Sequence, residues 1–356
     1  RAQGYRDHVI LAQPLARHRA TVDASEARER VRVREKFARF RELRVIVLDR
    51  ADAADRAIAR LQASGRYEFV ERDRLLRTAA TPNDPGFTQQ WSLNNSGQSG
   101  GVAGADIRAV AAWDITREAP NVIVAVLDSG VNIRHDDLTA NIWRNPAPTF
   151  GDVNGASFIN GVRTNDPSDV QGHGTHVAGI IGATGNNGTA MTGIAWRVQI
   201  MPVRVITAEG LIATSDFAAG VDYAIGHGAH IINVSLYTDT HSQADLTVVR
   251  AAREAGVILV AAAGNEAANV DTSPRYYPDA YPLDNIVSVG SSTRTETLSS
   301  FSNYGAAVDL VAPGSSILSL YFGNNTGTLS LGGTSMAAPH VAGALALIKA
   351  RFPNDN

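Results

Sequence analysis

The sequence contains no cysteine in 356 residues. Disulfide bonds and a thiol nucleophile are therefore excluded, and composition does not indicate the redox compartment. No stretch approaches the roughly 18 to 20 apolar residues that a membrane-spanning helix needs. The chain begins at Arg1 without a methionine or a hydrophobic signal core, so we expect its start to be processed or cut.

Charge is divided unevenly along the chain. Residues 1–80 carry a net charge of +7 (19 Lys and Arg against 12 Asp and Glu), and residues 81–356 carry −10 (13 against 23). A nucleic-acid-binding tail is one explanation, but the arginines are interleaved with apolar residues that keep structural periodicity. We interpret the contrast as attraction within the chain, between two folding units of unequal size.

Residues 1–80 predict a small α/β unit. The pattern gives strands at 8–13, 43–49 and 66–71, and helices at 23–37 and 51–64. Small residues and two prolines follow at 78–86, which predicts an exposed linker that a protease could cut.

Residues 81–356 contain recurring apolar runs that are continuous rather than alternating. Such runs are typical of strands in a mainly parallel sheet that helices cover on both faces, so the predicted fold class is α/β. Strands are expected at 122–127, 198–206, 230–236, 257–263, 286–289 and 308–311, and helices at 175–183, 215–226, 243–255 and 335–350.

An acid and a base stand next to buried segments. Asp128 follows the strand at 122–127 and so lies at the carboxyl edge of the sheet, although a lone Asp there is more often a turn or cap residue. His173 begins a small-residue helix between two glycines that allow close approach, which makes it the candidate base. His173 and His176 are alternatively metal ligands, but the His-Glu-x-x-His arrangement of a zinc hydrolase is absent.

Ser335 is the candidate nucleophile. It stands on the first turn of an apolar helix, with Thr334 as the expected cap, where helix N-terminal amides favour developing negative charge. Pro339 has no N–H to donate to the Ser335 carbonyl, which loosens the backbone beside the hydroxyl. A decoy Gly-x-Ser-x-Gly at 97–101 lacks a preceding strand and a following apolar helix, and it predicts a flexible loop.

The segments around Asp128, His173 and Ser335, in the chain order acid, base, nucleophile, resemble the subtilisin-like serine proteases. The resemblance covers most of residues 81–356. It implies that Ser335 attacks the peptide carbonyl, that His173 takes the proton and returns it to the leaving amine, and that Asp128 fixes the imidazole tautomer. It also implies that Asn265 donates a hydrogen bond to the oxyanion.

By the same resemblance, residues 1–80 look like an inhibitory propeptide with a ferredoxin-like fold, and residues 81–356 like the peptidase domain. The segment 77–80 would enter the cleft like a substrate and be cut near residue 80, so the protein would be a self-processing zymogen. The opposite charges of the two parts would favour their association.

The resemblance places an extended substrate between two segments, 210–212 and 235–237. The family carries a glycine where Tyr237 stands, which puts the width of the cleft in doubt, and Glu266 is expected to admit a basic residue. The residues expected to line the cleft are Gly210, Leu211, Ser235, Leu236, Tyr237, Ala262, Gly264 and Glu266.

A structural calcium ion is also implied by the resemblance, here to thermitase-like members of the family. Two carboxylates, one amide oxygen and three backbone carbonyls form a hard-oxygen set suited to Ca²⁺. Without the resemblance, the loop at 184–191 is an ordinary Asn/Gly turn. The expected ligands are Asp84, Asp137, Thr184, Asn187, Thr189 and Met191.

Only 21 residues follow Ser335, so the resemblance predicts that the last helices of the family are missing and the chain is truncated. It further implies a secreted, monomeric endopeptidase that acts on polypeptides and binds neither nucleic acid nor membranes. The competing hypothesis is a catalytically silent binding or inhibitor protein with the same fold. A lost triad residue would favour it, and all three are present.

Overall fold

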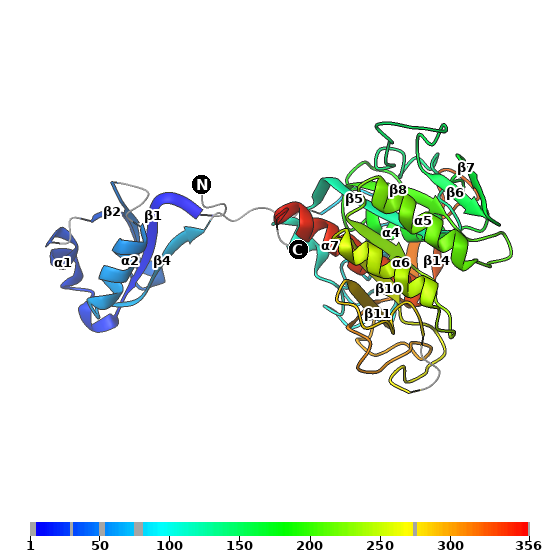
Figure 1. Cartoon of the computed structure of the whole chain (residues 1–356). Coiled ribbons are helices and arrows are strands. Elements are labelled where there is room, and N and C mark those ends of the chain that lie inside the picture. The colour runs from blue at the N-terminus through cyan, green and yellow to red at the C-terminus, as the bar shows by residue number, and fades with distance from the viewer. Residues whose placement is uncertain (1–4, 29–30, 50–53, 75–80, 273–275, 355–356) are drawn as a thin grey trace. The chain divides into compact units, whose positions relative to one another are not determined.

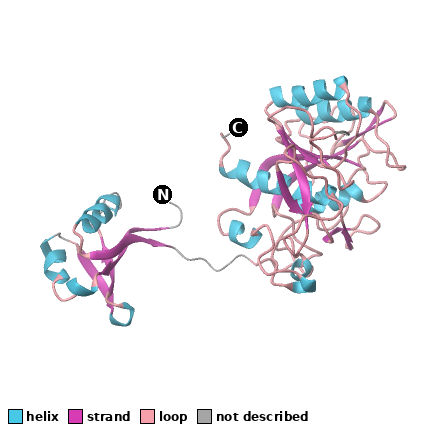
Figure 2. Ribbon diagram, turned by 90° about the horizontal axis from the view of Figure 1, so that it is seen from below, coloured by secondary structure: helices cyan, strands magenta, loops and turns pink. Residues whose placement is uncertain are grey.

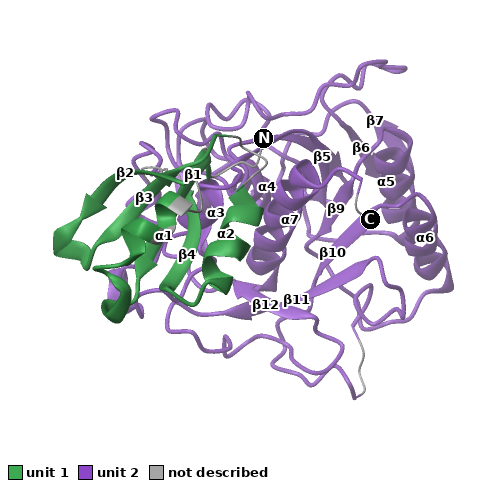
Figure 3. Cartoon of the chain, turned by 90° about the vertical axis from the view of Figure 1, so that its left-hand side faces the viewer, with its two compact units in different colours: residues 1–78 green, residues 79–356 purple. Residues whose placement is uncertain are grey.

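The computed structural model describes residues 5–28, 31–49, 54–74, 81–272 and 276–354. The chain forms two compact units, Arg1–Thr78 and Ala79–Asn356, coloured green and purple in Figure 3. Each unit has its own sheet and its own apolar core. The roles expected of the two parts stay predictions.

Unit 1 has the strand and helix order βαββαβ, which is that of a ferredoxin-like fold. Its antiparallel sheet has the strand order β2-β3-β1-β4, and one core joins Ile10 and Ile46 of the sheet to Leu61 of the second helix. The elements are β1 (Tyr5–Pro14), α1 (Val22–Arg28), β2 (Arg32–Phe37), β3 (Leu43–Val47), α2 (Ala54–Ala63) and β4 (Tyr67–Arg74).

The helix expected at 23–37 is wrong in its second part. Of the described residues in this range, 23–28 belong to α1 and 32–37 form the strand β2, which pairs antiparallel with β3 at the edge of the sheet. Its charged sequence has no apolar alternation that would indicate a strand, because an edge strand is half exposed and charge protects it from pairing with other chains. Pairing with β3 decides the structure where local propensity does not.

Unit 2 has a sheet of eight strands in the order β12-β11-β10-β9-β5-β8-β6-β7, parallel except for the β6–β7 pair. The strands are β5 (Glu118–Asp128), β6 (Ala156–Ile159), β7 (Val162–Thr164), β8 (Arg197–Arg204), β9 (Ile231–Val234), β10 (Ile258–Ala262), β11 (Ile286–Ser292) and β12 (Leu310–Pro313). A separate hairpin is formed by β13 (Ile317–Leu320) and β14 (Thr328–Leu331).

Helices cover both faces of this sheet (Figures 1 and 2). Val124 and Val126 of β5 belong to the core shared with α4 and α7, whereas Ala125 and Leu127 belong to the core shared with α5 and α6. The predicted α/β fold class is therefore confirmed. The helices are α3 (Ala109–Trp113), α4 (His173–Gly182), α5 (Thr214–Gly226), α6 (Gln243–Glu254) and α7 (Thr334–Arg351).

The linker expected at 78–86 is wrong for its second part. Residues 78–80 lie outside the described residues, but Pro82, Asp84 and Gly86 are buried in unit 2. Asp84 accepts hydrogen bonds from backbone N–H groups of the loop at 186–188, which anchors this segment. The decoy serine, Ser99, lies exposed in a short 3-10 helix that no strand precedes.

Candidate active site

Three adjacent strands end at the same edge of the sheet and carry the candidate residues. Leu127 of β5 and Val234 of β9 are register partners, so Asp128 and Ser235 follow them side by side. Val234 also pairs with β10, the strand that leads to Asn265. The carboxyl edge of a parallel sheet is where open α/β proteins bind their ligands.

Asp128 and His173 form a direct pair. The imidazole Nδ1 lies 2.8 and 2.9 Å from the two carboxylate oxygens of Asp128, which is fully buried, while the side chain of His173 is 26% exposed. Burial lowers the pKa of His173, but the charge and hydrogen bond of Asp128 outweigh it and raise the pKa above its usual value. Because Nδ1 donates to the carboxylate, Nε2 is free to accept a proton.

Asp169 organises the turn that leads into α4, and sequence analysis missed it. Its carboxylate accepts from the Ser129 hydroxyl (2.8 Å), from the Thr175 hydroxyl and from backbone N–H groups of residues 171, 172 and 175. Its negative charge also raises the pKa of His173. The sequence offers one sign of this role, the position of Asp169 four residues before His173. The hydrogen-bond partner of Asp169, Ser129, lies far from it in the sequence.

Ser335 and Ser235 hold each other through two hydrogen bonds. The Ser335 hydroxyl donates to the Ser235 carbonyl at 3.2 Å, and the Ser235 hydroxyl donates to the Ser335 carbonyl at 3.1 Å. The second bond satisfies the carbonyl that Pro339 leaves without its helical donor. The structure thus brings Ser335 to the sheet edge, with its hydroxyl bonded to Ser235 rather than to His173.

Thr334 does not cap α7 as expected. The helix has Gly333 at its N-cap position, and the Thr334 hydroxyl accepts from the Gly264 N–H and donates to the side-chain oxygen of Asn265. The same Asn265 oxygen accepts from the Thr334 N–H at 2.9 Å. Since its oxygen is engaged, the NH₂ group of Asn265 is the donor left for a ligand beside Ser335.

The expected cleft residues divide into two groups. Gly210 and Leu211 lie in an exposed turn closed by the Thr207 N–H to Leu211 carbonyl bond, whereas Ser235, Leu236, Ala262 and Gly264 follow or end strands of the sheet. The Tyr237 hydroxyl donates to the Glu266 carboxylate, which also accepts from Asn303 and from the Asn265 N–H. Burial and then Glu266 raise the pKa of Tyr237 to about 12. Glu266 is therefore engaged, and its expected selection of basic residues stays a prediction.

The expected calcium ligands gather around the loop at 184–191. Asp137 is fully buried and accepts from Asn187 Nδ2 (2.7 Å) and the Met191 N–H (3.0 Å). Burial raises the pKa of Asp137 to about 7, and the charge of Asp84 contributes to the rise. The hydroxyl oxygen of Thr184 is buried with no hydrogen-bond partner in the described part of the chain.

His176 lies apart from this edge. It is fully buried, and its Nε2 lies 3.1 and 3.0 Å from the carbonyls of Ile317 and Leu329 in the β13–β14 hairpin. Burial lowers its pKa to about 4. Its ring therefore joins a helix to a hairpin, and it does not share a site with His173.

A hydroxyl, an imidazole on a buried carboxylate and an amide donor, together at one sheet edge, are typical of serine hydrolases. The subtilase family model matches residues 119–356. The chain is 33% identical over 347 residues to a thermophilic serine proteinase of Bacillus sp. (strain AK1), covering 97% of this chain and 77% of that protein. It is 36% identical over 268 residues to thermitase of Thermoactinomyces vulgaris, covering 75% and 85%.

A solved structure of a protease from Pseudoalteromonas arctica is 33% identical to this chain, with a TM-score of 0.66, and the match covers 78% of this chain and 89% of the other. The chain belongs to the subtilase family, and it is a serine-type endopeptidase. The resemblance to subtilisin-like proteases is thereby confirmed. Among the helices of the described residues, none combines the length and apolar character that a bilayer-spanning segment requires.

Proposed function

We propose that this endopeptidase uses Ser335 as nucleophile, His173 as general base and then general acid, and Asp128 as the carboxylate that orients the imidazole. The observation that carries the proposal is the direct Asp128–His173 pair, because the buried Asp128 ends β5 beside Ser235, the residue that holds the Ser335 hydroxyl. Ser335, His173 and Asn265 are all partly exposed and so within reach of a substrate, whereas Asp128 is fully buried.

The first proposed step transfers the Ser335 proton to Nε2 of His173 as the oxygen attacks the peptide carbonyl. The hydroxyl must give up its bond to Ser235 for this step, and apo sites commonly tighten only when substrate binds. The imidazolium, stabilised by Asp128, then protonates the leaving amine, and water releases the acyl group by the same route.

Asn265 and the Ser335 N–H are the proposed donors to the oxyanion. Loss of one such donor costs roughly 3 kcal/mol of transition-state stabilisation. Asn265→Ala should therefore lower kcat by two to three orders of magnitude, roughly, while KM changes little. A rise in KM with kcat unchanged would instead indicate a role in substrate binding.

We propose that residues 1–80 are an inhibitory propeptide and that the protein is a secreted zymogen. A separate compact unit whose net charge is opposite to that of residues 81–356 supports the first part. In support of secretion, a relative that is 35% identical over 299 residues, and of which this chain covers 31%, is named a cell wall-associated protease of Bacillus subtilis.

The test compares the full chain with Ser335→Ala and with Ser99→Ala, the matched control in the decoy segment. Wild type and Ser99→Ala should cleave casein, react with a fluorophosphonate probe and release a fragment of about residues 1–80 on a gel. Ser335→Ala should do none of these. A properly folded wild-type chain that is neither labelled nor self-cleaved would contradict the proposal and favour a catalytically silent binding protein.

We also propose that Asp84 and Asp137 bind a structural Ca²⁺. The described residues contain no group of three or more His, Cys, Asp or Glu side chains that could hold a metal ion, so a cation here would need amide and carbonyl oxygens as well. The loop at 184–191 offers them, and two buried carboxylates that both bond to this loop suit a divalent cation. Calcium would supply a structural link and no catalytic step.

Calorimetry on the Ser335→Ala chain tests the calcium site. Free Ca²⁺ at a hundred times its Kd should stabilise residues 79–356 by about 2.7 kcal/mol relative to EDTA, and Asp137→Asn should remove this gain. Mg²⁺ at the same concentration is the control, since it prefers a tighter octahedral site. Equal melting temperatures in calcium and EDTA would disprove the site.

A further inference from the structure

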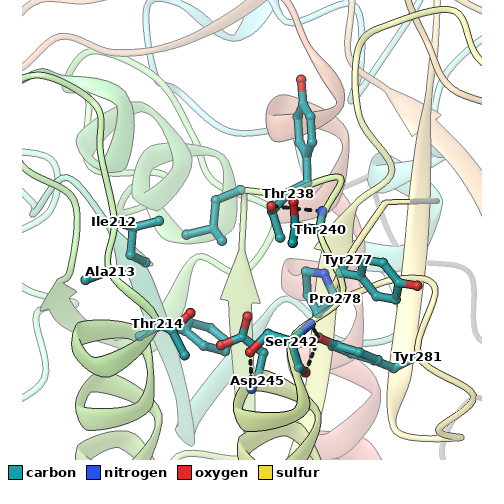
Figure 4. A pocket seen from close by; sticks show the side chains of 13 residues that line it. Ile212, Ala213, Thr214, Thr238, Thr240, Ser242, Asp245, Tyr277, Pro278 and Tyr281 are labelled. Atoms are coloured by element: carbon teal, nitrogen blue, oxygen red, sulfur yellow. Dashed lines mark hydrogen bonds between the residues drawn. The ribbon is translucent and has the colours of Figure 1, made fainter. Parts of the chain in front are cut away.

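A cavity of about 180 Å³ lies beside the residues that follow β9 (Figure 4). Leu236 and Tyr237 line one side, and Ile212, from the loop before α5, lines another. The rings of Tyr277 and Tyr281, whose centres lie 4.7 Å apart, complete the wall. The walls are thus largely aromatic and aliphatic.

One carboxylate stands in this apolar lining. Asp245 belongs to the first turn of α6, and Figure 4 shows its side chain between Thr214 and Ser242. Burial raises the pKa of Asp245, while the hydroxyls of Thr214 and Ser242 and the charge of His241 lower it. None of the described residues that line the cavity is a lysine or an arginine.

Helix capping does not account for Asp245. Ser242 is the N-cap residue and accepts from the Asp245 N–H at 3.1 Å. In a reciprocal capping box, an acidic side chain at this position would accept from the Ser242 N–H. That N–H donates to the Tyr281 hydroxyl at 3.2 Å instead. The Oδ1 atom of Asp245 is buried and has no hydrogen-bond partner within the described ranges.

The cavity adjoins the proposed substrate path. The Ser335 hydroxyl is bonded to the Ser235 carbonyl, and Leu236 and Tyr237 continue from there along the cavity. In an extended polypeptide lying on 235–237, alternate side chains point the same way, so one of them can reach the cavity within a few residues of the scissile bond.

We propose that this cavity binds the side chain of a lysine or arginine of the polypeptide substrate. The cation pairs with Asp245, and its methylene stem packs against Tyr277 and Tyr281. An aliphatic side chain would fit the walls but would leave the Oδ1 atom of Asp245 desolvated without a partner, which is unfavourable. The proposal rests on the proposed function and adds a substrate class to it.

The experiment measures kcat/KM on quenched fluorescent peptides after the full chain has been left to process itself. Their sequences are uncharged except for one lysine, moved position by position, and each has a twin with norleucine in its place. We expect one position at which lysine is preferred. Asp245→Asn should lower the lysine-to-norleucine ratio there about tenfold, and Asp245→Leu should favour norleucine.

Asp239→Asn is the matched control, because Asp239 is an exposed acid on the same loop that does not line the cavity. It should leave the ratio unchanged. An equal loss in Asp239→Asn, or no lysine preference at any position, overturns the proposal. Melting curves check that each variant folds.

Failure of the proposed function gives a different result. A chain that cleaves no peptide and does not react with the fluorophosphonate probe contradicts the catalytic assignment. The cavity proposal is then tested by binding: calorimetry measures the affinities of the lysine and norleucine peptides for Ser335→Ala. Equal affinities overturn the cavity proposal.

Discussion

Two buried carboxylates, one in each unit, are held in different ways. In unit 1 the guanidinium of Arg44, 1% exposed, lies 2.5 Å from the carboxylate of Glu26, 4% exposed, which also accepts from the Tyr67 hydroxyl. In unit 2 the buried carboxylate of Asp216 accepts from the backbone N–H groups of Asn160 and Gly161 at 2.7 and 2.9 Å.

Asp84 and Asp169 follow the same rule as Asp216, since backbone N–H groups supply most of their donors. Substituting the side chain of a donor residue leaves its backbone N–H in place, so these carboxylates keep those hydrogen bonds. The Glu26 carboxylate in unit 1 instead is paired with one cation, Arg44, which a single substitution can delete. The comparison therefore predicts where each unit is vulnerable.

The largest expected effect is in unit 1. Arg44→Met leaves the Glu26 carboxylate buried without its cation, which typically costs 3–5 kcal/mol, roughly. That is comparable with the whole stability of a domain of this size. Hydrogen exchange on the Ser335→Ala chain should show faster exchange in β1 and β3, with the sheet of unit 2 unchanged.

Two further variants make this test specific. Arg44→Met combined with Glu26→Gln should recover most of the loss, since no unpaired charge then remains in the core. Arg72→Met removes an ion pair with Asp55, which is 81% exposed, and should cost less than about 1 kcal/mol. Unaltered exchange in Arg44→Met would break the comparison.

The next effect is a loss of stability of unit 2 in acid. Burial lowers the pKa of His176 and of His340 to about 4, from the usual 6.5. Between these values the unfolded chain binds protons that the folded chain does not, so the free energy of unfolding falls as the pH drops. The expected loss is roughly 3 kcal/mol for each histidine.

Thermal unfolding at pH 7, 5.5 and 4.5 measures this loss. His340→Gln should flatten the dependence of unit 2 on pH, because the group that takes up the proton on unfolding is gone. His241→Gln, at an exposed histidine, is the control and should leave the slope as in wild type. A slope that His340→Gln does not change would show that acid acts through other groups.

The smallest effect concerns Asp169. Asp169→Asn weakens the hydrogen bonds that fix the start of α4, and it removes a charge that raises the pKa of His173. Activity needs neutral His173, so the acidic limb of kcat/KM should shift to lower pH, while kcat falls about tenfold with KM nearly unchanged. Asp166→Asn, at an exposed acid of the same loop, should do neither.

The fold of unit 2 was predictable because its central strands are buried on both faces. Runs such as 122–127 and 257–263 have no polar alternation, and they correspond to β5 and β10. The missed hairpins, β6–β7 and β13–β14, are short, and most of β7 and β14 is exposed, so their sequences resemble loops. Strand β2 was mistaken for helix because its Arg, Glu and Lys residues favour helix, and pairing with β3 makes it a strand.

The candidate site was predictable where long motifs mark it, at Asp128, His173 and Ser335. Asp169 was not, because its role depends on neighbours that only the folded chain assembles. The Thr334 cap failed for the same reason, since its hydroxyl bonds to Gly264 and Asn265 across the sheet edge. Capping propensity describes a helix end in isolation, whereas here the Thr334 hydroxyl makes tertiary hydrogen bonds in place of a cap.

The two bonds between Ser235 and Ser335 give the proposed nucleophile and the proposed substrate path a common support. A polypeptide that binds to residues 235–237 and shifts them would also shift the Ser235 carbonyl, which accepts the hydrogen bond of the Ser335 hydroxyl. Binding in the cleft and release of the Ser335 hydroxyl would then be coupled. A ligand that binds this segment without being cleaved would therefore displace the Ser335 hydroxyl without contacting it.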